Sequence, residues 1–226
     1  MKKITTALFL AVFSFTSASA EIGVNVGISG NMGVFVATAT ELDSGTHGTT
    51  SGQDEKRSDS EFLGLGWASV FIEKELGSRL IVGVDYVPDA LETETKEQSR
   101  TSAGDATEAT KTTVENKIAV DFEDLTTAYI GVKVFDHAYV KVGMMSVDVV
   151  TKETLGTGST YGNTDIDGTL YAIGYNKPFD NGLFVRAEGS YMEFDGASLT
   201  SSSGSQKITL DNLDGVAGKL SIGKSF

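Results

Sequence analysis

A histidine close to acidic and hydroxyl side chains is a starting point for nucleophilic catalysis, and this chain has two histidines. His47 lies near three residues that suit an acid and a nucleophile, Asp43, Ser44 and Ser51. The same composition is typical of a solvated loop, and the sequence holds neither G-x-S-x-G nor H-E-x-x-H. We therefore predict no catalytic residues and no enzymatic activity, with a surface acyltransferase or protease as a remote alternative.

Two further stretches partly match ligand-binding motifs. Residues 218–225 satisfy the phosphate-loop pattern G-x-x-x-x-G-K-[ST], but that motif needs a following helix and only Phe226 remains. Residues 163–168 match the first half of an EF-hand calcium loop, whose twelfth position here is Gly174 where a bidentate glutamate is needed. We interpret the first stretch as a strand and the second as a polar loop leading into a strand. No cofactor and no metal site is predicted.

A larger set of reactive side chains is charged and spread over several segments. These residues, which occupy the polar positions of alternating segments, are Asp85, Asp121, Glu123, Lys133, Lys141, Arg186, Glu188 and Lys219. Charges of both signs inside a small barrel need partners. We interpret the eight residues as a network of ion pairs that fills a barrel lumen, and the alternative is a narrow polar path for ions or small solutes.

Segments with a two-residue period position these charges. Between residues 117 and 135 one face is apolar and is predicted to include Val120, Phe122, Ile130 and Val132, while the other face is polar. Residues 80–86 and 183–191 show the same split, whereas residues 62–72 are apolar or small on both faces. Alternation also fits a secreted β-sandwich, but long segments and charges of both signs on the polar face favour a barrel. Trp67, Tyr171 and Tyr175 are candidates for an aromatic girdle.

Seven connections separate eight predicted strands. Three are short and rich in turn formers, at residues 76–78, 135–137 and 178–182, and His137 lies in the second. Four are long and polar, at residues 42–60, 93–116, 154–165 and 197–207. Long and short connections alternate, as in barrels with short periplasmic turns and longer extracellular loops. The sequence therefore predicts an all-β fold, an eight-stranded antiparallel transmembrane β-barrel with up-and-down topology.

The N-terminal residues and the composition narrow the class of protein. Lys2 and Lys3, an apolar stretch over residues 4–15 and the A-x-A site at residues 18–20 predict a cleaved signal peptide over 1–20, followed by a barrel domain over 21–226. No later apolar run approaches the ~18 residues of a membrane-spanning helix. The net charge of −13 argues against nucleic acid as a partner. With no cysteines, disulfides and cysteine-based metal sites are excluded.

The GNMGV run at residues 30–34 and the ending GVAGKLSIGKSF at residues 215–226 resemble small porin-like and OmpA/OmpW-like barrel proteins of Gram-negative outer membranes. The resemblance implies a cell outer membrane location, contact with outer-membrane lipid and lipopolysaccharide, and recognition by the barrel-assembly machinery. In that family the machinery reads the last strand, here Leu220, Ile222 and Phe226. Lys224 departs from the pattern, because an apolar or aromatic residue usually stands two positions before the end.

These observations predict a monomeric outer-membrane barrel with a structural or surface-interaction role. Short periplasmic turns and long polar extracellular loops belong to that interpretation. The competing function is transport, either as a passive porin-like channel for ions or small solutes or as a port for small apolar molecules of the kind attributed to OmpW-like proteins.

Overall fold

The computed structural model describes residues 23–43, 55–89, 91–92, 96–102, 112–154, 160–202 and 206–226. Its strands are β1 (Val24–Asp43), β2 (Glu55–Leu76), β3 (Leu80–Tyr86), β4 (Leu91–Glu92), β5 (Lys96–Ser102), β6 (Thr112–Lys133), β7 (Ala138–Thr154), β8 (Thr164–Pro178), β9 (Leu183–Phe194), β10 (Ala197–Thr200) and β11 (Gln206–Ser225). The predicted signal peptide at 1–20 lies outside the described residues.

Within the described ranges, no helix is both long and apolar enough to cross a membrane.

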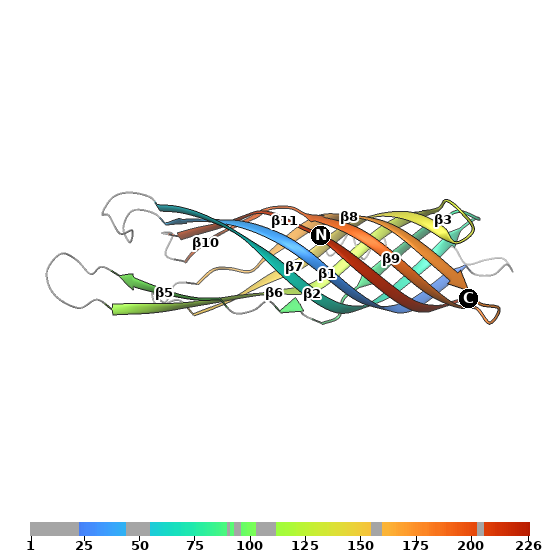
Figure 1. The fold of residues 1–226 in the computed structure, drawn as a ribbon, viewed down its shortest axis with the longest axis horizontal. Helices are drawn as coiled ribbons and strands as arrows, with labels where there is room; N and C mark the ends of the chain where they lie inside the picture. Colours follow the sequence, from blue (N-terminus) through green and yellow to red (C-terminus); the bar gives the residue numbers. More distant parts are fainter. Residues whose placement is uncertain are drawn as a thin grey trace.

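The strands form one antiparallel sheet that closes on itself (Figure 1). Neighbours follow the order β1, β2, β3, β6, β7, β8, β9 and β11, and β11 pairs back with β1 along its whole length. β3, β4 and β5 are successive segments of one leg that pairs with β6, and β10 continues the β9 leg along β11. The ring thus has eight strands in up-and-down order. This confirms the predicted fold class and excludes the two-sheet sandwich.

Three short connections lie at one end of the barrel. They span residues 77–79, 134–137 and 179–182, at the three predicted positions. Gly77 and Gly182 have φ angles of +66° and +79°, a conformation that favours glycine. Val24 and Phe226 exchange backbone hydrogen bonds at the same end. We name this the short-turn end.

At the opposite end the strands continue, so the predicted bounds of three of the four long loops are too wide, and what remains of these loops lies largely outside the described residues. β1 and β2 stay paired as far as Asp43 and Glu55, and β5 and β6 stay paired as far as Ser102 and Thr112. Much of 42–60 and 93–116 is therefore strand, and β10 occupies the first part of 197–207. The interval between β7 and β8 matches its prediction closely. Polar side chains do not prevent pairing, because the ladder satisfies the backbone groups whatever the side chains are.

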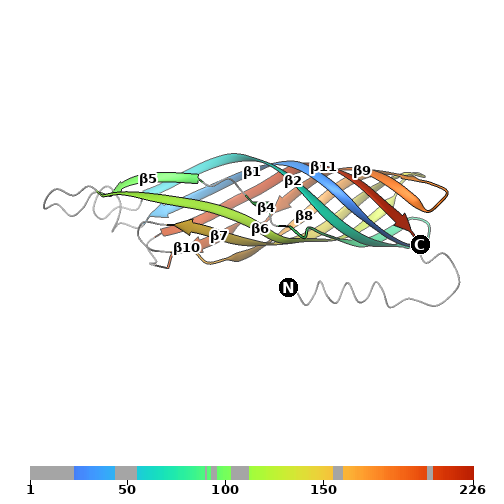
Figure 2. The ribbon, with the colours of Figure 1, turned by 90° about the horizontal axis from the view of Figure 1, so that it is seen from below.

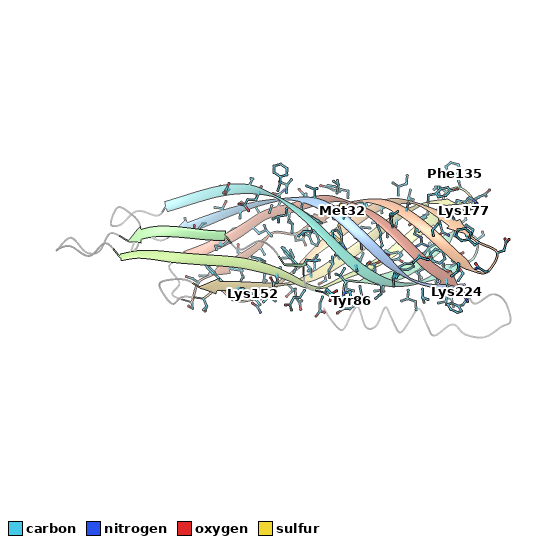
Figure 3. All side chains as sticks on the ribbon, turned by 60° about the horizontal axis from the view of Figure 1, so that its bottom comes forward. Met32, Tyr86, Phe135, Lys152, Lys177 and Lys224 are labelled. Atoms are coloured by element: carbon cyan, nitrogen blue, oxygen red, sulfur yellow. The ribbon has the colours of Figure 1, made fainter. Side chains whose placement is uncertain are left out.

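The outward face of the sheet carries an apolar belt near the short-turn end. Its exposed members include Ile28, Met32, Val34, Val70, Ile130, Val132, Val142, Met144, Tyr171, Ile173, Tyr175, Val185, Tyr191, Val216, Leu220 and Ile222. Met32, labelled in Figure 3, is 75% exposed. Tyr171 and Tyr175 face outward as girdle residues would, whereas Trp67 packs against the interior. Exposed apolar surface of this extent marks contact with a membrane or a partner.

The interior has two zones. Near the short-turn end it is charged, as described below. Farther along lies the apolar zone, a cluster of buried side chains made of Phe35, Val87, Leu125, Met145, Val147, Val149, Ile166, Leu170, Met192, Phe194 and Leu213. Leu63, Leu65 and Trp67 pack against this cluster from β2. One apolar face of residues 62–72 therefore packs against the apolar zone, and the other lies on the outer surface.

A bulge in β6 changes which of its residues face the interior. The pairing with β7 shifts between Glu123 and Thr126, and Asp124 has a φ of +55°. One extra residue in a strand reverses the two faces beyond it. Val120 and Phe122 consequently pack against the apolar zone. The prediction that these two residues face lipid is wrong.

Candidate functional site

Six charged side chains from five strands meet in the barrel interior at the short-turn end. They form the charged zone, which consists of Glu73 on β2, Asp85 on β3, Lys141 on β7, Arg186 and Glu188 on β9, and Lys219 on β11. Exposed and buried residues alternate through most of β9, so Arg186 and Glu188 share its inward face. The closure of the sheet brings the five strands together around one interior.

Glu73 and Arg186 form a two-pronged ion pair across the interior. The Nη1 atom of Arg186 donates to Oε2 of Glu73 at 2.9 Å, and Nη2 donates to Oε1 at 2.6 Å. Glu73 also accepts hydrogen bonds from the Asn25 amide at 3.0 Å and the Tyr129 hydroxyl at 2.9 Å. Only 1% of Glu73 is exposed. Fork-to-fork geometry of this kind fixes both side chains, since two parallel hydrogen bonds resist rotation.

Glu188 is held by a second pair of donors. The Lys141 ammonium lies 2.6 Å from Oε1, and the Tyr139 hydroxyl donates to Oε2 at 2.6 Å. Lys219 forms the third pair by donating to Asp85. The charged zone therefore contains three acids and three bases in three pairs. Its formal charge is zero, which lowers the cost of burying it.

Aromatic rings fill the space around these charges. The Arg186 guanidinium carbon lies 5.1–5.3 Å from the ring centroids of Phe71, Tyr139 and Phe184. Lys141 lies 4.5 Å from the centroid of Tyr129. Cations at these distances are attracted to the ring faces. Glycines are paired directly across from the rings, for example Gly174 opposite Tyr139, where a Cβ atom would collide with the ring.

A partly exposed ion pair lies next to the charged zone. Lys133 donates to Glu75, and each side chain is 28% exposed. Glu75 also accepts from Asn25 at 3.3 Å, so it connects with the ligands of Glu73. Of the eight lumen charges suggested by the sequence, Lys133 is thus at the edge of the group, while Asp85, Lys141, Arg186, Glu188 and Lys219 lie within it.

Asp121 and Glu123 do not join the charged zone. Both precede the bulge in β6, and they are paired with Val150 and Asp148 on the strand face opposite the apolar zone. Asp121 is buried and pairs with Lys152. The two-residue period alone placed these carboxylates in the lumen, and the extra residue in β6 moves them out of it.

The sequence interpretation missed Glu73, the most buried charge of the zone. Glu73 comes directly after 62–72, where two apolar faces hid the inward direction. A usable signal was present, because Glu73, Phe71 and Ser69 share one parity and Glu73 is the first charge in that series. Tyr129 and Tyr139 were also missed as hydroxyl donors to the carboxylates.

The remaining sequence candidates have the following positions. His47, Ser44 and Ser51 lie outside the described residues, and the absence of enzymatic activity stays a prediction. His137 is in the turn between β6 and β7, with its ring 5.6 Å from that of Tyr175. The phosphate-loop match is part of β11. In the described part of the chain, no group of three or more histidine and acidic side chains is arranged to hold a metal ion.

The suggested assembly residues Leu220, Ile222 and Phe226 are all exposed on the outer surface. Their recognition by the assembly machinery stays a prediction.

The barrel wall is incomplete on one side of β2. β2 and β3 are paired only from Leu76 with Leu80 to Val70 with Tyr86. The ladder stops there because the next position facing β2 is Pro88, which has no N–H to donate. No other described strand pairs with this edge of β2 beyond Val70. A shallow groove on the outer surface extends over β11, β1 and β2 and reaches this edge at Ala68, Val70 and Pro88. We name this place the β2 seam.

Comparisons with known proteins give structural likeness only. No family model matches the chain, and no curated protein matches it. The solved structures that resemble it include outer membrane protein OprG from Pseudomonas aeruginosa, with 10% identity, a TM-score of 0.47, and coverage of 91% of this chain and 97% of OprG. Outer membrane protein AlkL in lipid bilayers has 15% identity, a TM-score of 0.47 and 95% coverage of both chains.

A third similar structure is outer membrane protease OmpT from Escherichia coli, with 8% identity, a TM-score of 0.44, and coverage of 94% of this chain and 99% of OmpT. One of the three is a protease, and the fold of this chain is established by its own strand pairings. The solved structures that this chain resembles are outer-membrane β-barrel proteins.

Proposed function

We propose that the protein is an integral outer-membrane barrel with a structural or surface-interaction role, closed to ions by its charged zone. The apolar belt supports the membrane location, because lipid is the environment that such a band of outward apolar side chains suits. The observation that carries the closed state is the set of three mutual ion pairs in the interior.

Packing on both sides of the ion pairs supports closure. An eight-stranded barrel has an interior just wide enough for side chains. Phe71, Tyr139 and Phe184 fill the spaces beside Arg186, and the apolar zone continues beyond them. An ion that crossed this interior would have to displace paired charges and then pass through apolar packing, where an unpaired charge is costly.

Strands that extend beyond the belt support a surface-interaction role. β5 and β6 project together at the end opposite the C-terminus (Figure 2). β1 and β2 also stay paired past the belt, as far as Asp43 and Glu55. Paired strands present side chains on a more rigid surface than an unstructured loop would, since the backbone ladder fixes their spacing.

Planar-bilayer recording tests the closed state. We expect no discrete conductance from the refolded protein, because the three ion pairs and the apolar zone leave no polar path. A gel that compares heated and unheated samples shows whether the added protein is folded. Reproducible channel openings from protein that is folded on this gel would instead favour the passive-pore alternative.

The β2 seam favours a second candidate function, a port for small apolar molecules. Backbone groups of alternate residues point to opposite sides of a strand. The backbone N–H of Glu75 donates to the carbonyl of Gly23, just before β1, so odd-numbered residues of β2 direct their backbone groups toward β1. The even-numbered Gly64, Gly66 and Ala68 therefore direct theirs toward the side that β3 leaves uncovered. Inward neighbours on the same stretch, such as Trp67, pack against the apolar zone. The seam therefore adjoins both the outer surface and an apolar interior.

Uptake of a small apolar fluorescent dye tests this second candidate. A bulky residue in the groove, Ala68→Trp, is expected to slow dye uptake severalfold in cells that carry the barrel, because it narrows the seam. Ala187→Trp is the matched control, since Ala187 is also exposed on the outer face but lies on β9. Equal uptake rates for the two variants would count against the port.

A further inference from the structure

Three strands carry an outward lysine near the short-turn end. Lys74 on β2, Lys177 on β8 and Lys224 on β11 each stand two residues beyond an apolar residue of the same outward face, namely Ile72, Tyr175 and Ile222. Their cross-strand partners are the outward residues Val24, Val185 and Val26. Figure 3 labels Lys177 and Lys224 at the same end as Phe135. Each lysine is thus the first outward charge on its strand at this end, and an exposed apolar residue, Leu76, Phe179 or Phe226, follows two positions later.

These lysines occur on alternate strands around part of the ring. β9 lies between Lys177 and Lys224, and β1 lies between Lys224 and Lys74. The strands between them contribute only apolar outward residues at this level, including Val26 and Leu183. Two strand spacings separate neighbouring lysines by about 10 Å. We name these three side chains the basic arc.

The charge on the outer surface reverses at the other edge of the belt. The first outward charges there are acidic on four consecutive legs, with Asp148 on β7, Asp167 on β8, Glu193 on β9 and Asp214 on β11. Lysines that served only as general interface anchors would be expected at both edges. Lys56, Lys152 and Lys207 do lie toward that end, but Lys152 comes after Asp148 and Lys207 comes after Asp214 on the way out from the belt, and Lys56 is six residues from Phe62 on its strand. Only at the short-turn end do lysines directly follow apolar residues of the belt face.

Among the described residues, no acid forms an ion pair with the three lysines of the basic arc. Glu75 points inward and pairs with Lys133. Asp136 and Asp180, the described acids of the short turns, lie in the connections beyond the strands. The Nζ atom of Lys224 lies 5.5 Å from the ring centroid of Phe226, so its ammonium group lies near this ring while the residue as a whole is exposed. A binding role also accounts for lysine at 224, the position that departs from the assembly pattern.

We propose that the basic arc binds the phosphate groups of anionic glycerophospholipids in the leaflet beside the short turns. Charge complementarity supports this partner, since basic residues that flank a membrane attract anionic lipids. The apolar residues between the lysines would contact the acyl chains of the same lipids. The proposal rests on the membrane location given under the proposed function.

Spin-labelled lipids test the proposal on the refolded protein in phosphatidylcholine vesicles. The measured quantity is the association of labelled phosphatidylglycerol with the protein relative to labelled phosphatidylcholine. We expect a preference for phosphatidylglycerol on the order of fivefold, falling close to one in the double variant Lys74→Gln, Lys224→Gln. The matched control, Lys56→Gln with Lys207→Gln, changes the same charge at exposed positions toward the other end and is expected to keep the preference.

Two results would overturn the proposal. One is a wild-type protein that inserts and folds but shows no preference for phosphatidylglycerol. The other is an equal loss in both double variants, which would assign the preference to net charge alone. Failure to insert into vesicles at all would contradict the membrane location itself, so the two proposals fail in distinguishable ways.

Discussion

Replacing Arg186 with methionine is expected to lower the free energy of unfolding by about 3–5 kcal/mol, because the change leaves a buried carboxylate without its cation. Glu73 is 1% exposed and takes two of its hydrogen bonds from Arg186. Asn25 and Tyr129 would still donate to Glu73, but neither carries a charge. Methionine fills most of the arginine stem volume, so the loss reports the charge and not a large cavity.

Urea unfolding followed by tryptophan fluorescence measures this effect. Trp67 is the single tryptophan, and it packs against the apolar zone, so its emission reports the loss of interior packing. The double variant Glu73→Met, Arg186→Met removes both charges and is expected to recover most of the loss. Lys133→Met is the matched control, because each side chain of its pair with Glu75 is 28% exposed and water can solvate the carboxylate that is left, so the loss should be smaller. A smaller effect for Arg186→Met than for Lys133→Met would contradict the buried network.

The two-residue alternation of apolar and polar side chains identified the fold, because most strands follow it without interruption. Lys141, Arg186 and Glu188 were placed correctly on inward faces, since β7 and β9 alternate regularly through these positions. In β6 the same reasoning gave the wrong faces for the residues before the bulge, because the bulge adds one residue to the strand. Asp124 adopts a positive φ, and the only local sign of the bulge is that this charge interrupts the apolar series of its face between Phe122 and Thr126. Asp121 and Glu123 were therefore assigned to the wrong face.

The two-residue period could not show which inward side chains form ion pairs with each other. A strand pattern tells which side chains point inward, but the ring register decides which of them meet. Arg186 and Glu73 are 113 positions apart and come from strands that β1 and β11 separate in the closed ring. The extended strands were missed for a different reason. Residues 93–116 have the polar composition of a loop, while the pairing of β5 with β6 is set by backbone hydrogen bonds that composition does not report.

Replacing Ile173 with arginine is expected to cost about 2–4 kcal/mol in a bilayer, because the side chain lies in the middle of the belt and faces outward. Ile173 is 65% exposed and stands near the centre of β8, away from both ends of the strand. Val132→Arg should cost less, since Val132 is paired with Leu80 next to a short turn and lies closer to the interface. Position within the belt, more than the residue type replaced, sets the size of the effect.

The free energy of unfolding is measured in vesicles and again in a detergent-free aqueous control. The comparison shows whether lipid or water surrounds this face of the barrel. Thr169→Arg is the matched control, because Thr169 is outward on the same strand, four residues toward the acidic edge and directly paired with Glu193. Its expected cost is about 0–1 kcal/mol. If water surrounded the barrel, arginine at an exposed position such as Ile173 would change the free energy of unfolding very little. Equal, small costs at Ile173 and Thr169 in vesicles would therefore remove the lipid-facing assignment, and with it the membrane location on which the closed-barrel function depends.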